Sequence, residues 1–199
     1  DESIQIAKIF ANAVAAIFQK LSLEKELREQ RDRLKILSTH DTLTGLPNRR
    51  YIEKEAYQTI QLSKRYNRRT SVLYLDLNNF KEINDSFGHE AGDNFLVEIA
   101  SRLKSSLRKS DLVARMGGDE FVFILPETDS NGAITLVKKI YSTLKKPLKV
   151  GEDEVIVSGS MGISIFPTDG EDFNTLLRKA DSAMYKAKTT GKLYCLYSS

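Results

Sequence analysis

The stretch Arg115-Met116-Gly117-Gly118-Asp119-Glu120-Phe121 is the most informative part of the chain, because two glycines lead directly into two adjacent carboxylates. Apolar runs flank it, from Leu112 to Met116 and from Phe121 to Leu125. A Gly-Gly pair between apolar runs predicts a β-hairpin, since both central turn positions can then take a positive φ. A tip without side chains lets a ligand approach the backbone, and acids there can hold a divalent cation. An ordinary solvated turn can have the same composition, so only the other motifs of the chain can distinguish a functional hairpin from such a turn.

Length and composition limit the classes of protein that the chain can belong to. Its 199 residues, 41% hydrophobic and 29% charged, fit one globular domain with an extra segment. The net charge of +3 gives no indication of a nucleic-acid partner. Two histidines and one cysteine, Cys195, cannot form a zinc site or an intramolecular disulfide, which favours a reducing, cytoplasmic location. The apolar stretch from Ile9 to Phe18 is too short to span a membrane, although a longer parent protein could still be anchored.

The first 39 residues are predicted to form a separate signalling helix, followed by a domain over residues 40–199. Residues 3–39 contain neither glycine nor proline, which favours one long helix. A heptad pattern fits ten positions, of which eight are apolar: Ile6, Ile9, Ala13, Ala16, Lys20, Leu23, Leu27, Gln30, Leu34 and Leu37. The charged outer faces favour a coiled coil over the alternative, a single amphipathic helix packed on its own domain.

The remaining segments alternate between helical and strand-like patterns. Val72 to Leu77, Val155 to Phe166 and Tyr194 to Tyr197 are predicted strands, the first of them central because its apolar run is almost continuous. Helical spacing marks segments after Pro47, from Phe95 to Leu107, after an Asn131 cap, and from Phe173 to Met184. These patterns predict an α/β (α+β) fold with a mainly antiparallel central sheet flanked by helices.

A second group of polar residues begins at Asp76, inside the apolar strand. A carboxylate there is costly to bury unless it is paired or binds a metal. Beside the hairpin, Asp76 and Asp119 would form a cation site suited to Mg²⁺ (or Mn²⁺), which uses few carboxylates and takes other ligands from substrate phosphates and water. In a regular strand Asp119 and Glu120 point to opposite faces, so we expect different roles for them. Lysines at 81, 188 and 192 can supply positive charge to phosphate oxygens.

These motifs closely resemble the GGDEF family of diguanylate cyclases. The resemblance covers residues 38–195 and rests on four motifs in order: Asp41…Leu43-Thr44-Gly45-Leu46-Pro47-Asn48-Arg49, Asp76…Phe80-Lys81…Asn84-Asp85…Gly88-His89…Gly92-Asp93, Arg115 to Phe121, and Ala180-Asp181…Met184-Tyr185…Lys188…Gly191-Lys192. It implies a palm-like, ferredoxin-like nucleotide cyclase fold. It also implies the condensation of two GTP molecules into cyclic di-GMP.

The resemblance also implies roles for individual residues. Asp76, Asp119 and the main-chain carbonyl of Leu77 would hold Mg²⁺, and Asp119 and Glu120 would be catalytic; which of the two helps to deprotonate the 3′-hydroxyl stays open. Asn84 and Asp93 would read guanine, whose acceptor and donor edges suit an amide and a carboxylate. The remaining substrate contacts implied by the family are Phe80, Lys81, Gly117, Gly118, Lys188 and Lys192.

Regulation is implied as well. Each domain would hold one GTP, so two domains of a homodimer must face each other, and the N-terminal helix would hold the pair. Arg108 and Asp111 match the family's inhibitory site for the product cyclic di-GMP; a charged helix end is the alternative. Asn78 occupies a position where the family often has Asp. Because this position is not the principal metal ligand, we expect little loss of activity from the change.

A catalytically silent module that binds GTP or cyclic di-GMP is the main alternative function. Silent family members usually have eroded glycine-turn motifs, whereas Gly117 to Phe121 are intact here. A dimerisation unit alone would leave Asp76 unexplained. The stretch from Ile6 to Leu23 resembles the last helix of a GAF sensor domain, and the tail from Gly191 resembles the run into an EAL domain, so we expect a fragment of a longer protein.

Overall fold

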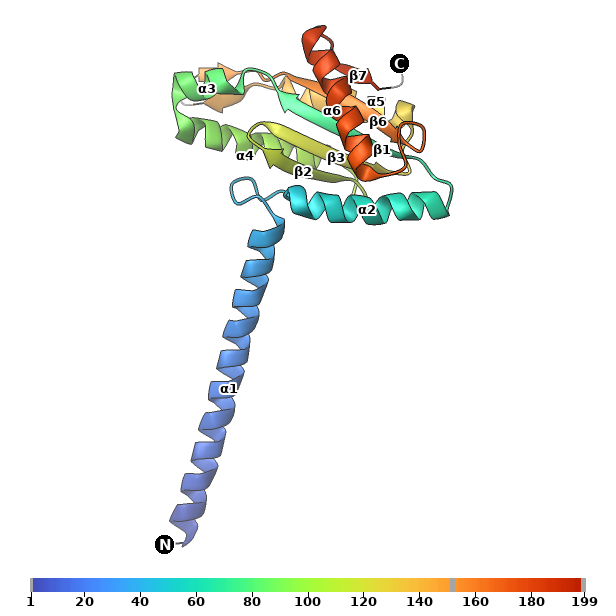
Figure 1. Cartoon of the computed structure of the whole chain (residues 1–199). Coiled ribbons are helices and arrows are strands. Elements are labelled where there is room, and N and C mark those ends of the chain that lie inside the picture. Colours follow the sequence, from blue (N-terminus) through green and yellow to red (C-terminus); the bar gives the residue numbers. More distant parts are fainter. Residues whose placement is uncertain (1, 151–152, 198–199) are drawn as a thin grey trace. The chain divides into compact units, whose positions relative to one another are not determined.

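The structure is a computed structural model that describes residues 2–150 and 153–197; before Ile17 it describes the side chain of Lys8 only. The chain forms two compact units that divide between Ser38 and Thr39. The first unit is helical, and the second contains a sheet with helices on both faces (Figure 1). Among the described residues, no helix is long and apolar enough to cross a membrane.

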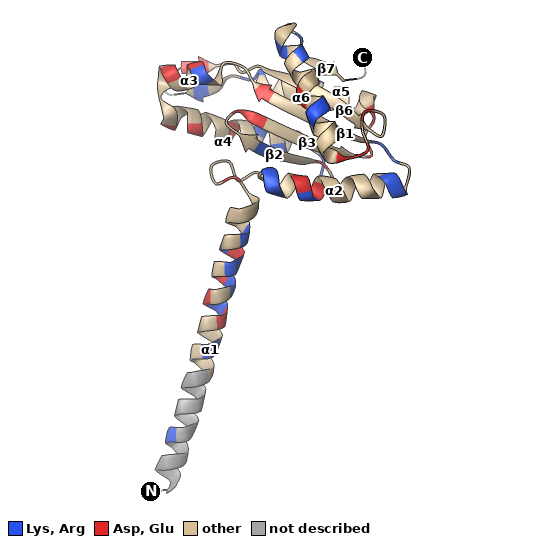
Figure 2. Ribbon diagram, viewed as in Figure 1, with Lys and Arg blue, Asp and Glu red and all other residues tan. Residues whose placement is uncertain are grey.

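The first unit is helix α1 (Glu2–Thr39), which confirms the predicted helix. Its predicted heptad residues Leu23, Leu27, Leu34 and Leu37 are 50–67% exposed. Charges of both signs alternate along its C-terminal half (Figure 2) and form exposed i,i+4 pairs at 3.9 Å. Such pairs add only a few tenths of a kcal/mol, roughly 0.3–0.5 each, so they stabilise the helix little while its described apolar side chains stay exposed. The predicted heptad residues Ile6, Ile9, Ala13 and Ala16 lie outside the described side chains.

The second unit is organised around a five-stranded sheet. The strand order is β2 (Leu112–Gly117), β3 (Glu120–Pro126), β1 (Thr70–Leu77), β6 (Gly159–Phe166) and β7 (Tyr194–Leu196). All neighbours are antiparallel except β6 and β7, which are parallel. The predicted central strand is confirmed, because β1 lies third of five and is buried along its length except at Asp76.

Helices cover both faces of this sheet. Side chains at alternate positions of β1 enter two separate cores, as the two-residue period of a strand requires. Leu73, Leu75 and Leu77 pack in the core that includes α4 (His89–Ser105) and α5 (Ser130–Leu144). Val72 and Tyr74 pack in the core that includes α2 (Arg49–Arg65) and α6 (Phe173–Thr189). The mixed α/β fold with a mostly antiparallel, helix-flanked sheet is therefore confirmed.

Helix α6 lies against β6 at the closest backbone approach in this core. A Cβ atom on Gly162 would lie 1.9 Å from the Ala180 carbonyl oxygen and 2.2 Å from the Met184 nitrogen. Only glycine therefore permits this helix-to-strand distance. The contact matters for the site described below, because α6 carries Asp181 and Lys188.

Two local predictions are wrong. The predicted strand from Val155 to Phe166 is divided: β5 (Asp153–Val155) pairs with β4 (Leu148–Val150) in a separate hairpin, and β6 begins at Gly159. The predicted cap Asn131 lies inside α5. Asp129 is the N-cap, because its backbone is extended and its carboxylate accepts the Gly132 N–H at 2.9 Å.

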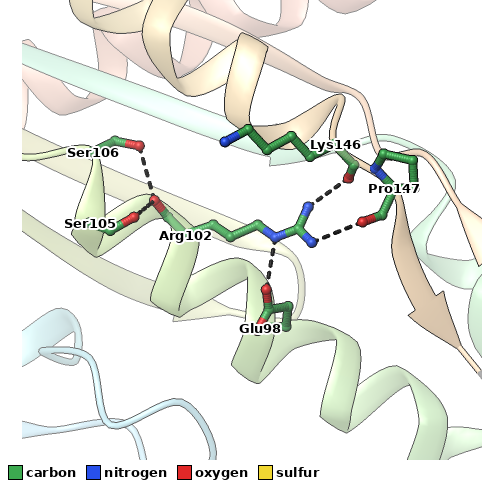
Figure 3. A network of polar contacts seen from close by, with 6 residues as sticks. All are labelled: Glu98, Arg102, Ser105, Ser106, Lys146 and Pro147. Atoms are coloured by element: carbon green, nitrogen blue, oxygen red, sulfur yellow. Dashed lines mark hydrogen bonds and ion pairs between the residues drawn. The ribbon is translucent and has the colours of Figure 1, made fainter.

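A partly buried arginine joins α4 to the segment that connects α5 with β4 (Figure 3). The Arg102 guanidinium donates to the carbonyl oxygens of Lys146 at 2.6 Å and Pro147 at 3.0 Å. Its Nε donates to Glu98, one turn earlier on α4, at 2.9 Å. Planar guanidinium groups suit this kind of multiple donation, and the network fixes the start of the β4–β5 hairpin.

Candidate active site

The predicted hairpin is present, but its turn lies one residue later than the sequence indicates. Gly117 pairs with Glu120, so Gly118 and Asp119 form the two-residue turn, and a register shift lies between Arg115 and Gly117. Gly117 and Gly118 have φ values of 149° and 50°, which explains the glycine pair. The strand-alternation argument for Asp119 and Glu120 is wrong, because Asp119 is a turn residue and only Glu120 belongs to β3.

The base of the hairpin is joined to the loop that precedes α2. The Arg115 side chain is only 10% exposed; its Nε donates to the Gly118 carbonyl at 2.9 Å and its Nη1 to Asp41 at 3.0 Å. The same Asp41 oxygen accepts the Thr44 N–H at 2.8 Å and the Thr44 hydroxyl at 2.6 Å. The role of Asp41 and Arg115 as a brace for the hairpin was not predicted from the sequence.

The hairpin brings the three predicted acids to the end of β1. Asp76 lies directly opposite Glu120 in the β1–β3 register, and the Leu77 N–H donates to the Asp119 carbonyl at 3.2 Å. Burial, with the neighbouring Asp76 charge adding to it, raises the pKa of the Asp119 carboxyl. Like charges held this close are unfavourable unless a cation joins them, and this is the arrangement that a divalent metal stabilises.

One predicted phosphate contact, Lys188, joins this acid group. Its Nζ donates to Asp76 Oδ1 at 2.6 Å, and this hydrogen bond, together with the surrounding carboxylates, raises the pKa of Lys188. Lys188 is therefore protonated at neutral pH and neutralises part of the negative charge. Figure 2 shows the acidic ends of β1 and β3 close to the basic residues of α6.

Two further residues contribute to the site without having been predicted. Tyr74 lies two residues before Asp76, on the same face of β1 and diagonal to Glu120 on β3, and its hydroxyl interacts with the Glu120 carboxylate. Burial and the Glu120 charge raise the pKa of Tyr74, so the hydroxyl keeps its proton. Burial and the Asp76 charge raise the pKa of Asp181 on α6. Tyr74 could have been identified from the sequence, because side chains two positions apart on a strand lie on the same face of the sheet, and Tyr74 is two positions before Asp76.

The predicted guanine readers lie on α3 (Phe80–Phe87) and at the start of α4. A Cβ atom on Gly92 would lie 1.9 Å from Asn84 Oδ1, so the Asn84 amide lies directly over Gly92, the residue before Asp93. Asp93 itself is exposed. The two helices thus place the Asn84 amide next to the residue that precedes Asp93. Phe80 packs on Phe95, with ring centroids 5.8 Å apart, and so supports α3 against α4.

The other predicted contacts are more dispersed. Lys81 on α3 and Lys192 after α6 are exposed side chains whose contact with phosphate stays a prediction. Asn78 is held at the end of β1, since its amide donates to Ser158 at 3.1 Å and accepts from Ser160 at 3.2 Å. An ionised aspartate at this position could accept the hydrogen bond from Ser160 but could not donate one to Ser158, which explains structurally why asparagine fits here.

Arg108 and Asp111 form a turn between α4 and β2. Helix α4 ends at Ser105, so Arg108 is not in the last helical turn and the helix-end alternative is wrong. The Asp111 carboxylate accepts the Arg108 N–H at 3.0 Å, and the Asp111 N–H donates to the Arg108 carbonyl at 3.1 Å. The turn borders a pocket of about 370 Å³, lined also by His40 and Tyr51. The Arg108 side chain is exposed and available to a ligand.

The domain is thus a mixed α/β domain whose mostly antiparallel, helix-flanked sheet has paired acids and a glycine hairpin at the end of its central strand. The family model for "Diguanylate cyclase, GGDEF domain" matches residues 38–193, and the chain belongs to this family. The predicted family is therefore confirmed.

Individual relatives agree with this assignment. The bifunctional diguanylate cyclase/cyclic di-GMP phosphodiesterase MucR of Pseudomonas aeruginosa is 41% identical over 164 residues, 82% of this chain and 24% of MucR. The cyclic di-GMP phosphodiesterase PdeR of Escherichia coli is 36% identical over 188 residues, 94% of this chain and 28% of PdeR. The solved GGDEF domain of TpbB from P. aeruginosa is similar with a TM-score of 0.77 at 38% identity, over 79% of this chain and 94% of that domain.

The chain spans about a quarter of the length of MucR and PdeR. Family membership and the relatives named as cyclases support cyclic di-GMP synthesis in general, whereas relatives named as phosphodiesterases also contain a matching segment.

Proposed function

We propose that this domain condenses two GTP molecules into cyclic di-GMP and releases pyrophosphate. The observation that carries the proposal is the convergence of Asp76, Asp119 and Glu120 at the glycine hairpin, beside the Lys188 ammonium. The reaction is phosphoryl transfer, in which positioning and charge stabilisation supply most of the catalysis. An intact hairpin with its acids in place is what such a site requires.

The carboxylates fit a divalent cation. Asp76 and Asp119 interact electrostatically, and burial together with the Asp76 charge raises the pKa of Asp119. With Leu77 following Asp76 directly in β1, its carbonyl is the proposed third protein ligand. A bound Mg²⁺ (or Mn²⁺) would draw charge off the triphosphate and lower the pKa of the attacking 3′-hydroxyl. Among the described residues there is no group of three or more acidic, His or Cys side chains placed to hold a metal, so substrate oxygens complete the proposed coordination.

Lys188 has a second role in this proposal. In the structure it neutralises Asp76 at 2.6 Å. A cation bound at Asp76 would free the Lys188 ammonium to contact phosphate oxygens, and the raised pKa of Lys188 keeps the ammonium charged for this role. Lys81 and Lys192 are proposed to contact the same triphosphate, and the Gly117 and Gly118 backbone forms the wall of the site.

Guanine is proposed to bind between α3 and α4. The Asn84 amide, placed over Gly92, pairs with an acceptor edge, and the adjacent Asp93 carboxylate accepts from the ring N–H and the amino group. Once a bound base covers these polar groups, a base that lacks the matching partners is disfavoured, since the unpaired groups cost free energy. Asp93→Ser is expected to weaken selection for GTP over ATP.

Catalysis is proposed to require a homodimer held by α1, since each domain binds one of the two GTP molecules. The exposed stripe that includes Leu27 and Leu34 supports this proposal. Leu27→Lys is expected to shift sedimentation to the monomer and to reduce activity at low protein concentration. The control Asp32→Lys introduces the same residue on the outer face. A monomer with and without residues 1–39, at unchanged activity, would refute the proposal.

Product inhibition is proposed at the Arg108–Asp111 turn. The exposed Arg108 guanidinium can stack on or pair with guanine, while the Asp111 carboxylate and N–H, both hydrogen-bonded to the Arg108 backbone, hold the turn in place. Arg108→Ala is expected to raise the cyclic di-GMP concentration that halves the rate. Lys109→Ala, at the next exposed position, is the control. Inhibition that is unchanged in Arg108→Ala would exclude this site.

The function itself is tested by incubating the chain with GTP and Mg²⁺ and analysing the nucleotides by mass spectrometry. Cyclic di-GMP is expected from the wild type and from Glu154→Gln, a control at an exposed acid of β5. Asp76→Asn is expected to form little product. GTP that binds without conversion, in protein freed of prebound product, would instead support the alternative proposal of a silent regulatory module.

A further inference from the structure

Tyr74 joins the hydrophobic core to the acid group of the site. It lies on β1 between Val72 and Asp76, facing the core with α2 and α6, and is only 9% exposed. Its register partners are Val122 on β3 and Gly162 on β6. The ring belongs to this buried cluster, so the position of its hydroxyl is set by the core rather than by solvent.

That hydroxyl faces Glu120, its diagonal neighbour across the β1–β3 pair, and interacts with a carboxylate whose other neighbours are mostly negative. Asp76 lies opposite Glu120 in the register, and the charges of Asp119 and Asp181 also act on it. Lys188 attracts Glu120, but its hydrogen bond is made to Asp76. Repulsion from three carboxylates would turn the Glu120 side chain away from the site and towards water. The Tyr74 hydroxyl opposes this movement by donating from the core side.

We propose that Tyr74 is a positioning residue for Glu120, which keeps the Glu120 carboxylate beside Asp76 and ready for the metal-dependent step. This inference rests on the proposed function, because it concerns the same site. The inference goes beyond the hairpin motif, because it assigns part of the orientation of Glu120 to a residue on the neighbouring strand β1. A phenol is well suited to this task, since it adds a donor without adding a charge.

The test is Tyr74→Phe, which removes the hydroxyl and keeps the ring in the core. We expect kcat to fall by about tenfold or more, the fold-change that loss of a hydrogen bond to a charged group gives. The KM for GTP should stay within about twofold, because Glu120 is not placed at the guanine or triphosphate contacts. The Mn²⁺ concentration for half-maximal activity should rise. Tyr57→Phe, at a 65% exposed tyrosine of α2, is the matched control and should change none of these.

A second readout does not require turnover. Binding of 3′-deoxy-GTP, which lacks the attacking hydroxyl, is measured by calorimetry at several Mn²⁺ concentrations. Tyr74→Phe should need more Mn²⁺ than the wild type to reach the same affinity. In a Glu120→Gln background the same substitution should have no further effect, since the charged acceptor is already absent. Thermal melting checks that Tyr74→Phe retains its fold.

The outcomes separate the two proposals. A wild type that makes no cyclic di-GMP refutes the proposed function, and the Mn²⁺ dependence of 3′-deoxy-GTP binding then decides on Tyr74 alone. Equal kcat and equal Mn²⁺ dependence in wild type and Tyr74→Phe overturn the positioning role. So does an equal effect of Tyr74→Phe in the wild-type and Glu120→Gln backgrounds, or a loss of activity that merely follows a loss of folded protein. A wild type without Mn²⁺-dependent binding of 3′-deoxy-GTP overturns the positioning role, whereas the proposed function is decided by the formation of cyclic di-GMP.

Discussion

Replacing Gly162 by Ala should separate α6 from the sheet. The added Cβ would lie 1.9 Å from the Ala180 carbonyl oxygen, whereas close contacts between carbon and oxygen lie at about 3.3–3.6 Å. The helix backbone must therefore move by more than about 1 Å, because no side-chain rotation can relieve a contact with backbone atoms. Overpacking usually costs about 1–3 kcal/mol, and we expect a loss in the free energy of unfolding near the upper end of this range.

The assay is urea unfolding of the full chain, followed by circular dichroism. Gly132→Ala is the matched control, because the only close contact of its Cβ would be with the Thr128 methyl group at 2.8 Å, a side-chain atom, whereas Asp129 Oδ1 lies at an ordinary 3.5 Å. The control should stay within about 1 kcal/mol of the wild type, since alanine also favours the helix. A loss below about 1 kcal/mol in Gly162→Ala would refute the close packing of α6 against β6. In the folded fraction, kcat should fall because Lys188 and Asp181 move with α6.

Three further changes test other parts of the structure. Burial alone would raise the pKa of Asp41, but hydrogen bonds from Thr44 and Arg115 hold the pKa below its usual value. The Asp41 carboxylate therefore stabilises the fold above about pH 4, and this stabilisation is lost as the pH falls through the lower folded pKa. In urea unfolding, the free energy of unfolding lost in Asp41→Asn should thus become smaller in acid, and a loss that does not change with pH would contradict the role of these hydrogen bonds. Lys188→Met should reduce kcat at least tenfold while Lys186→Met does not, and an active Lys188→Met enzyme would exclude the phosphate role. Arg102→Met should lower the free energy of unfolding by about 1–3 kcal/mol, because the carbonyls of Lys146 and Pro147 lose their donor, whereas a neutral result would show that water replaces it.

The main elements could be predicted because their patterns are strong and local. The apolar run of β1, the glycine-free helix α1 and the Gly-Gly hairpin each follow from backbone preferences, and the structure contains all three. Asp76 could be recognised because a carboxylate in a buried strand requires a partner, and it has one in Lys188.

The unpredicted features depend on contacts between distant segments. The β6 boundary at Gly159 depends on close packing against β1, where a Cβ atom on Gly159 would lie 3.0 Å from the Asp76 carbonyl oxygen, and no local pattern reveals this contact. The Arg115–Asp41 brace joins residues 74 positions apart. The position of the hairpin turn depends on the register shift after Arg115, and the Tyr74–Glu120 contact depends on strand pairing.

Condensation of GTP by the acids at the hairpin is tested most directly by following every reactant and product. GTP consumed and pyrophosphate and cyclic di-GMP released are measured for the wild-type chain, with Mg²⁺ and with chelator. We expect Mg²⁺-dependent cyclic di-GMP, with two GTP consumed and two pyrophosphates released for each product molecule, and none from Asp119→Ala. Intact GTP after prolonged incubation of dimeric, product-free wild type would contradict the proposed function.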